Sequence, residues 1–104
     1  MAIYYAKRHD RSPREMKYNV TTTRKAERQL LKLPVQMQLR ITAGIRGLAD
    51  SETWGDVRRL VNHKYGYRLR VGNYRVLFDL TENGALAIGD ISVEEVKKRD
   101  EHTY

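Results

Sequence analysis

Three arginines around an expected tight turn are the residues of this chain best suited to chemistry. Gly72-Asn73 separates two runs of alternating side chains, which is a strong signal for a two-residue β-hairpin loop. Such a loop sets Arg70 opposite Arg75, and the alternation of side chains adds Arg68 to the same face. Like charges directly opposite each other destabilise a sheet, so we expect this face to bind an anion. The alternative is a solvated outer face that happens to be basic.

The other face of this hairpin is apolar and is expected to lie on the core. The loop length predicts Val71 opposite Tyr74, Leu69 opposite Val76 and Arg68 opposite Leu77. Alternation then gathers one apolar set: Tyr67, Leu69, Val71, Tyr74, Val76 and Phe78. The hairpin is therefore predicted to connect a core to an anion-binding surface.

Charge narrows the class of partner. The 104 residues include 20 Lys and Arg against 13 Asp and Glu, which gives a net charge of +7. Residues 57–78 contain no acidic residue and these basic ones: Arg58, Arg59, Lys64, Arg68, Arg70 and Arg75. A local positive field of this kind attracts polyanions, so nucleic acid or an acidic protein fits.

Composition excludes several other classes. The chain has no cysteine, and His9, His63 and His102 form no metal-ligand spacing, so we expect no metal and no cofactor. No apolar run reaches membrane-spanning length, and the first residues lack the apolar core of a signal peptide. The expectation is a cytoplasmic protein with no membrane partner.

The periodic pattern predicts one α+β domain over residues 16–104, in which a helical hairpin packs on one face of an antiparallel meander, in the order β-α-α-β-β-β. Residues 1–15 are expected to be an arm: a flexible segment, a cloning remnant or the product of an upstream start codon. Ile3-Tyr4-Tyr5 within it has the composition of a short strand.

The expected elements follow from caps, breakers and turns. A helix begins after Thr22 or Thr23 and runs to about Leu33, where Pro34 breaks it. The remaining elements are a strand over Lys17–Thr22, a helix over about Val35–Ala49, strands over Val57–Val61 and Ala85–Val93, and a short helical turn over Glu94–Arg99. Trp54 is expected to cover the end of the core; the alternative is stacking on a nucleic-acid base.

The chain resembles the RelE/ParE toxin superfamily, the toxin halves of bacterial type II toxin–antitoxin systems. The resemblance covers about residues 16–104 and combines the order of elements with three motifs. These are Tyr67-Arg68-Leu69-Arg70, Asn73-Tyr74-Arg75-Val76 and the terminal Lys98-Arg99-Asp100-Glu101-His102-Thr103-Tyr104. It implies a cognate antitoxin, which we expect to present an acidic or amphipathic segment.

The superfamily has two main activities. RelE-type members are metal-independent endoribonucleases that cleave messenger RNA on the ribosome and inhibit translation. ParE-type members inhibit DNA gyrase without catalysis and generally lack the basic catalytic set. A third possibility for this chain is a plain basic nucleic-acid-binding module.

The RelE resemblance gives each basic position a role. Arg68 and Arg70 stand where RelE-type members have lysines, and Arg75 stands at the basic position of the next strand. Lys98 falls where an arginine is expected, and Tyr104 falls on the terminal tyrosine that stacks on the substrate base. Arg58, Arg59, Lys64 and Arg99 are expected to bind RNA around them.

RNA cleavage needs no metal, because the 2′-hydroxyl of the RNA is itself the nucleophile. Arginine suits the stabilisation of the transition state, since its planar fork binds two phosphate oxygens and stays charged. It is a poor base at neutral pH, because its pKa is above about 12. His102 is therefore the candidate acid or base; the alternative is an exposed tail histidine. His63 is expected to be a surface residue.

Overall fold

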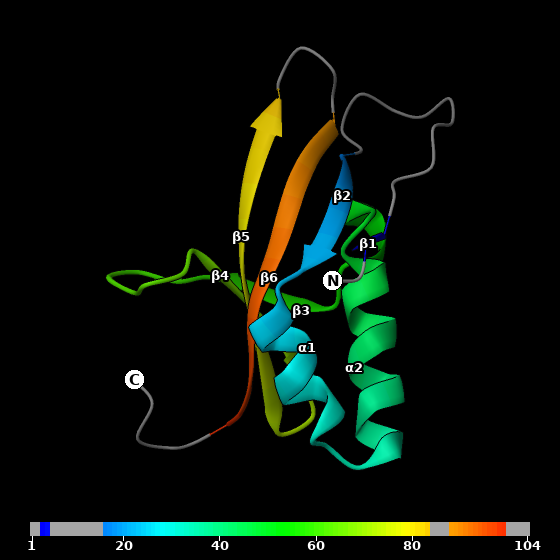
Figure 1. The fold of residues 1–104 in the computed structure, drawn as a ribbon. Coiled ribbons are helices and arrows are strands. Elements are labelled where there is room, and N and C mark those ends of the chain that lie inside the picture. The colour runs from blue at the N-terminus through cyan, green and yellow to red at the C-terminus, as the bar shows by residue number, and fades with distance from the viewer. Residues whose placement is uncertain (1–2, 5–15, 84–87, 100–104) are drawn as a thin grey trace.

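Two helices cover one face of a six-stranded sheet (Figure 1). The structure, a computed structural model, describes residues 3–4, 16–83 and 88–99. Its elements are β1 (Ile3–Tyr4), β2 (Lys17–Thr22), α1 (Arg24–Leu31), α2 (Val35–Gly47), a 3₁₀ turn (Ser51–Thr53), β3 (Asp56–Arg59), β4 (Tyr67–Val71), β5 (Tyr74–Asn83) and β6 (Ile88–Lys98). The α+β class and the helical hairpin packed on the sheet are confirmed.

The sheet is mixed rather than fully antiparallel. Its strand order is β1-β2-β6-β5-β4-β3, and β2 pairs with β6 in parallel while every other pair is antiparallel. The expected all-antiparallel meander is thus wrong at one pair. The reason is that the chain leaves β2 through two helices, and the last strand of the meander returns beside β2 in the same direction.

Part of the expected N-terminal arm belongs to the sheet. Ile3 pairs with Thr21 and Tyr4 pairs with Val20, so β1 is an antiparallel edge strand beside β2. Residues 1–2 and 5–15, the rest of that expected arm, lie outside the described residues.

The Gly72-Asn73 hairpin has the register that its loop length predicts. Arg70 is the partner of Arg75, Leu69 of Val76 and Arg68 of Leu77. Gly72 adopts a φ of +57°, in the left-handed region that favours glycine. This backbone conformation explains why glycine stands at position 72. The two-residue turn that it forms sets Arg70 opposite Arg75.

Thr23 caps the first helix. Its hydroxyl accepts a hydrogen bond from the Ala26 backbone N–H at 3.1 Å, which settles the choice between Thr22 and Thr23. Farther along α1, the Gln29 side-chain carbonyl accepts a hydrogen bond from the Val96 N–H at 2.7 Å. This bond attaches the helix to β6 at a point where β2 has already ended.

The end of β6 differs most from expectation. The strand continues to Lys98, so the predicted helical turn over Glu94–Arg99 is wrong. A bulge lies between Leu77 and Phe78 in the pairing of β5 with β6, where Leu77 is the partner of Glu95 and Phe78 is the partner of Val93. Val93 and Val96 both join the core although they are three residues apart, a spacing that is typical of a helix.

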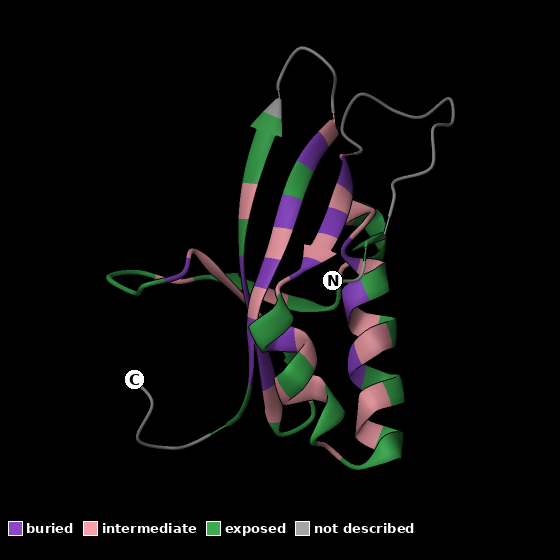
Figure 2. Ribbon diagram, in the orientation of Figure 1, coloured by how far each residue is buried: buried purple, intermediate pink, exposed green. Residues whose placement is uncertain are grey.

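The core lies between the sheet and the helices. Buried residues alternate with more exposed ones along β2 and β6, and α2 turns its exposed side outward (Figure 2). Ile41, Ile45 and Leu48 contribute the helical side of this core. Pro34 precedes α2, which ends at Gly47, two residues before the expected limit.

Trp54 covers one end of the core, as expected. Its ring centroid lies 5.4 Å from that of Tyr18 and 6.3 Å from that of Phe78. The indole N–H donates to the Leu48 carbonyl at 2.9 Å. A partly buried ring with its polar atom satisfied fits a structural role.

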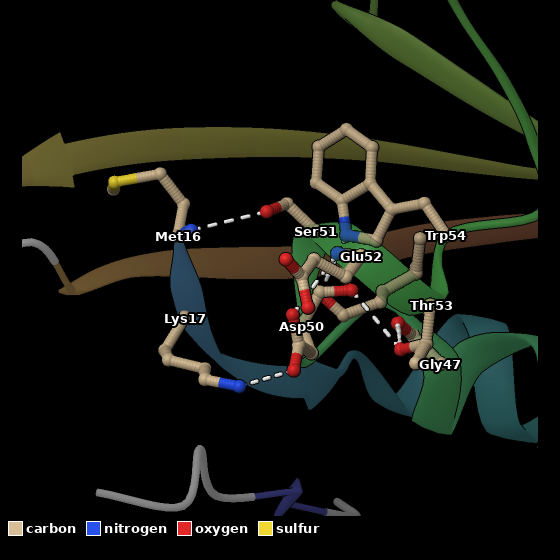
Figure 3. Close-up of polar contacts among 9 residues, drawn as sticks. Met16, Lys17, Gly47, Asp50, Ser51, Glu52, Thr53 and Trp54 are labelled. Carbon is tan, nitrogen blue, oxygen red and sulfur yellow. Dashed lines mark hydrogen bonds and ion pairs between the residues drawn. The ribbon is translucent and has the colours of Figure 1, made fainter. Parts of the chain in front are cut away.

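A polar clamp ties the start of β2 to the connection between α2 and β3 (Figure 3). The Met16 N–H donates to the Ser51 hydroxyl at 3.0 Å, and the Ser51 N–H donates to the Met16 carbonyl at 2.9 Å. Lys17 forms an ion pair with Asp50, whose other carboxylate oxygen accepts from the Glu52 N–H at 2.9 Å. The clamp fixes the register of β2 against the helical layer.

Replacing Gly89 by alanine is expected to lower the free energy of unfolding by about 1–3 kcal/mol, the usual cost of overpacking. A Cβ atom at Gly89 would lie 2.5 Å from the Thr81 carbonyl oxygen and 2.8 Å from the Tyr18 ring. Urea unfolding measures the loss. The matched control is Gly55→Ala, whose Cβ would meet only the end of the Leu69 side chain at 3.3 Å. An equal loss in both variants would contradict the packing argument.

Candidate anion-binding face

The sheet face away from the helices carries the arginines in two rows. Strand pairing gives the first row, across β6, β5, β4 and β3, as Lys97, Arg75, Arg70 and Asp56. The second row is Glu95, Leu77, Arg68 and Arg58. Neighbours within a row stand about 5 Å apart on adjacent strands, so the first row brings three cations together.

The three predicted arginines differ in exposure. Arg70 is exposed, whereas the Arg75 side chain is buried, with 2% of its surface exposed. The Arg68 side chain is 11% exposed, and its Nη1 lies 3.1 Å from the Asp56 carbonyl and 3.4 Å from the Asp56 carboxylate. This face is therefore partly covered rather than openly solvated, and Arg70 is the arginine of the hairpin that solvent reaches most freely.

The connection between β3 and β4 supplies part of this cover and projects from the side of the sheet opposite the helices (Figure 1). The Gly66 N–H donates to the Asp79 carboxylate at 2.7 Å, and the Gly66 carbonyl accepts from the Leu60 N–H at 2.7 Å. The strand alternation is interrupted at Gly66. Tyr65 is consequently buried and hydrogen-bonds Glu95 on the face of the arginines, not on the face of Tyr67.

Glu95 is a buried carboxylate with several partners. Its Oε1 lies 3.3 Å from Lys25 Nζ and 3.8 Å from Lys97 Nζ, and the Tyr65 hydroxyl donates to it. Burial alone would raise the pKa of Glu95, but the hydrogen bonds from Tyr65 and Lys25 and the charge of Lys97 together lower it. Burial and the bond to Glu95 raise the pKa of Tyr65.

Two of the sequence-predicted basic residues belong to the other face of the sheet. Lys98 is the partner of Tyr74, and Arg59 is the partner of Tyr67. Both tyrosines pack against the core on the side of the helices. The placement of Lys98 among the arginines therefore fails, and Lys97 takes that place.

The other predicted RNA-binding residues are all exposed but are not gathered at one point. Arg58 belongs to the second row, and Arg99 follows the end of β6. Lys64 lies in the β3–β4 connection, with its Nζ 5.4 Å from the centre of the Tyr65 ring. Arg58 therefore lies on the face itself, whereas Lys64 and Arg99 lie in the segments beside it.

Sequence reasoning missed Lys97 and Glu95, and it weighed Tyr65 only as an alternative to Tyr104 for stacking on a base. The bulge in the β5–β6 pairing decides which lysine faces the arginines, and its signal is the three-residue spacing of Val93 and Val96. A reading of that segment as a strand with one extra residue would have found Lys97.

Of the three histidines, His63 is the one that lies within the described residues. His63 is exposed, as expected, and its Nδ1 accepts a hydrogen bond from the Tyr65 N–H at 3.1 Å. His102 and Tyr104, the predicted proton-transfer and base-stacking residues, lie outside the described residues, as does His9.

In the described part of the chain, no three histidine, aspartate or glutamate side chains gather as metal ligands. No helix there is both long and apolar enough to span a bilayer. Comparison with known protein families and with curated proteins found no match to this chain.

Replacing Glu95 by glutamine is expected to lower the free energy of unfolding by about 1 kcal/mol at pH 7, because a charged acceptor of two hydrogen bonds is lost. A carboxylate with a lowered pKa stabilises the fold above its unfolded-state value of 4.5. That contribution disappears as the pH falls through the folded-state pKa. The difference between variant and parent should therefore shrink below about pH 4.5.

Urea unfolding at pH 7 and at about pH 3.5 measures this dependence. Asp90→Asn is the control, since Asp90 is an exposed carboxylate on the same strand. A stability difference for Glu95→Gln that stays constant across this range would contradict the assignment of the charge.

Proposed function

We propose that this chain is an endoribonuclease toxin of the RelE type, which cleaves messenger RNA on the ribosome without a metal ion. The observation that carries the proposal is the pairing of exposed Arg70 with buried Arg75 on the sheet face that the helices leave open. The resemblance of the hairpin motifs to that family supports it.

The arginine pair suits the stabilisation of a pentacovalent phosphate. Attack of the RNA 2′-hydroxyl on the adjacent phosphate adds negative charge to the non-bridging oxygens, and the 5′-oxygen leaves with a proton. A guanidinium held by a buried site needs little reorganisation as that charge develops. Arg75 would supply the fixed charge, and exposed Arg70 would close on the phosphate from the neighbouring strand.

Proton transfer is assigned by resemblance alone. His102 is proposed as the acid or base, because imidazole titrates near neutral pH, and Tyr104 is proposed to stack on the RNA base. Arg68 is a supporting residue in this proposal, since its guanidinium is already held by Asp56.

The two alternative functions, gyrase inhibition and plain nucleic-acid binding, would each give a positive result in a different assay. A ParE-type inhibitor would block supercoiling by DNA gyrase and would tolerate loss of the arginine pair. A basic nucleic-acid-binding module would bind with a steep salt dependence and give no cleaved product. Purified protein incubated with programmed ribosomes, and separately with gyrase and relaxed DNA, distinguishes the three.

Arg70→Ala is expected to lower the rate of messenger-RNA cleavage about 10²–10³-fold, the usual cost of one transition-state donor. Its folding should be nearly unchanged, within about 0.5 kcal/mol, because the side chain is exposed. Primer extension on ribosome-bound messenger RNA gives the rate. Arg59→Ala, an exposed arginine on the opposite face, is the comparison for loss of charge.

Arg75 needs a different substitution. The side chain is buried, so Arg75→Ala is expected to lose stability as well as activity, and Arg75→Lys keeps the charge while removing the planar fork. Full cleavage by a folded variant that lacks both Arg70 and Arg75 would overturn the ribonuclease proposal.

The helical layer offers a surface for the proposed antitoxin. Leu31, Val35 and Leu39 are exposed at 70%, 69% and 67%, at a spacing of four residues. A cavity of about 250 Å³ lies beside them between α1, α2 and β6, with Leu30, Leu31 and Ile45 in its wall.

Exposed basic residues surround this apolar stripe. Arg28, Lys32 and Arg40 stand on the outer side of the helices. An amphipathic segment with acidic residues around an apolar face complements such a surface in both shape and charge. We therefore propose that the antitoxin docks on the helical layer.

Leu39→Glu is expected to release the antitoxin and restore growth inhibition on co-expression, because a charge would enter the apolar contact. Co-purification measures the complex. Gln36→Glu is the matched control, since it adds the same charge at an exposed position of α2. Equal loss of the complex in both variants would mean that net charge, and not the apolar stripe, determines binding of the antitoxin. That result would contradict the proposed site.

A further inference from the structure

Lys97 is the cation at the β6 end of the first row. It is the register partner of Arg75, and its side chain is 45% exposed. Its neighbour Lys98 carries the same charge on the same strand but pairs with Tyr74 on the opposite face. The two adjacent lysines therefore lie on opposite faces of the sheet.

The described acid beside Lys97 is shared with two other partners. Glu95 Oε1 lies 3.8 Å from Lys97 Nζ, near the limit of an ion pair, but 3.3 Å from Lys25 Nζ. The Tyr65 hydroxyl also donates to this carboxylate. Glu95 stands in the second row, opposite Leu77, so its backbone position lies one row away from those of the three cations.

We propose that Lys97 binds an RNA phosphate together with Arg70, next to the buried charge of Arg75, and that Tyr65 is a positioning residue that limits how closely the Glu95 carboxylate approaches Lys97. The inference rests on the proposed function for the identity of its ligand, RNA. It differs from the family resemblance, which assigns the basic position to Lys98.

The Glu95 carboxylate and an RNA phosphate would compete for Lys97. A carboxylate released from Tyr65 would be free to turn toward Lys97, the cation already at 3.8 Å, and would neutralise it. The Tyr65 ring is buried on the same face, so Tyr65→Phe removes the hydroxyl while the ring still fills its place. That substitution isolates the hydrogen bond from the packing.

The first experiment compares Lys97→Gln with Lys98→Gln in the full chain. The probe is a fluorescein-labelled single-stranded RNA oligonucleotide with 2′-methoxy groups, which binds but cannot be cleaved through its 2′-oxygen. Fluorescence anisotropy should show affinity about tenfold weaker for Lys97→Gln, as for loss of one charged contact. The slope of log Kd against log salt should fall by about 0.7. Lys98→Gln should change the affinity less than twofold.

The second experiment tests Tyr65 by rescue. Tyr65→Phe should weaken binding of the same probe severalfold, and the double variant Tyr65→Phe/Glu95→Gln should recover it, because the competing charge is gone. A role for Tyr65 in folding alone predicts no such recovery. Urea unfolding of each variant accompanies the titrations.

The outcomes separate the inference from the proposed function. Binding that depends on Lys97, with no cleavage of messenger RNA by the parent chain, supports the anion site and overturns the ribonuclease. Cleavage by the parent with equal losses in the two lysine variants, or a larger loss in Lys98→Gln, overturns the inference alone. Failure of the parent to bind the probe, or failure of the double variant to recover, also overturns it.

Discussion

The pairing of β5 with β6 determines which side chains meet on each face of this protein. One bulge, between Leu77 and Phe78, lets two strands of unequal residue count stay side by side. On one side it brings Val93 and Val96 into the core, and on the other it aligns Lys97 with Arg75. The hydrophobic layer and the cation row therefore depend on the same irregularity, and a shift of one residue there would exchange the two sets of side chains.

The face away from the helices has a small packed layer of its own. Tyr65, Leu77 and Glu95 are buried there, and Arg75 is buried with them. Exclusion of water strengthens the field of a charge held at such a site, although burial of the charge is itself costly. Buried Arg75 lies between exposed Arg70 and exposed Lys97. The face therefore has one fixed positive charge and two positive charges on side chains that can move.

The sequence could predict the parts that depend on local rules. The two-residue loop set the register of the hairpin, Thr23 met the requirements of a helix cap, and Pro34 separated the two helices. The parallel pairing of β2 with β6 could not be inferred this way, because it joins segments some 70 residues apart through the core. The position of Tyr65 stayed open, since parity places it on the face of Tyr67 unless Gly66 interrupts the alternation, and the contact of Gly66 with Asp79 accompanies that interruption.

The bond between Gln29 and Val96 bears on self-association. Among the described residues, no strand pairs with β6 beyond Val93 on the side of β2, so the second half of β6 has a backbone edge without a strand partner there. Such edges recruit strands from other copies and seed aggregates. The Gln29 carbonyl occupies the Val96 N–H, and the helix that carries Gln29 lies against that edge. A single amide in the first helix thus removes a docking position that a second molecule would need to extend the sheet.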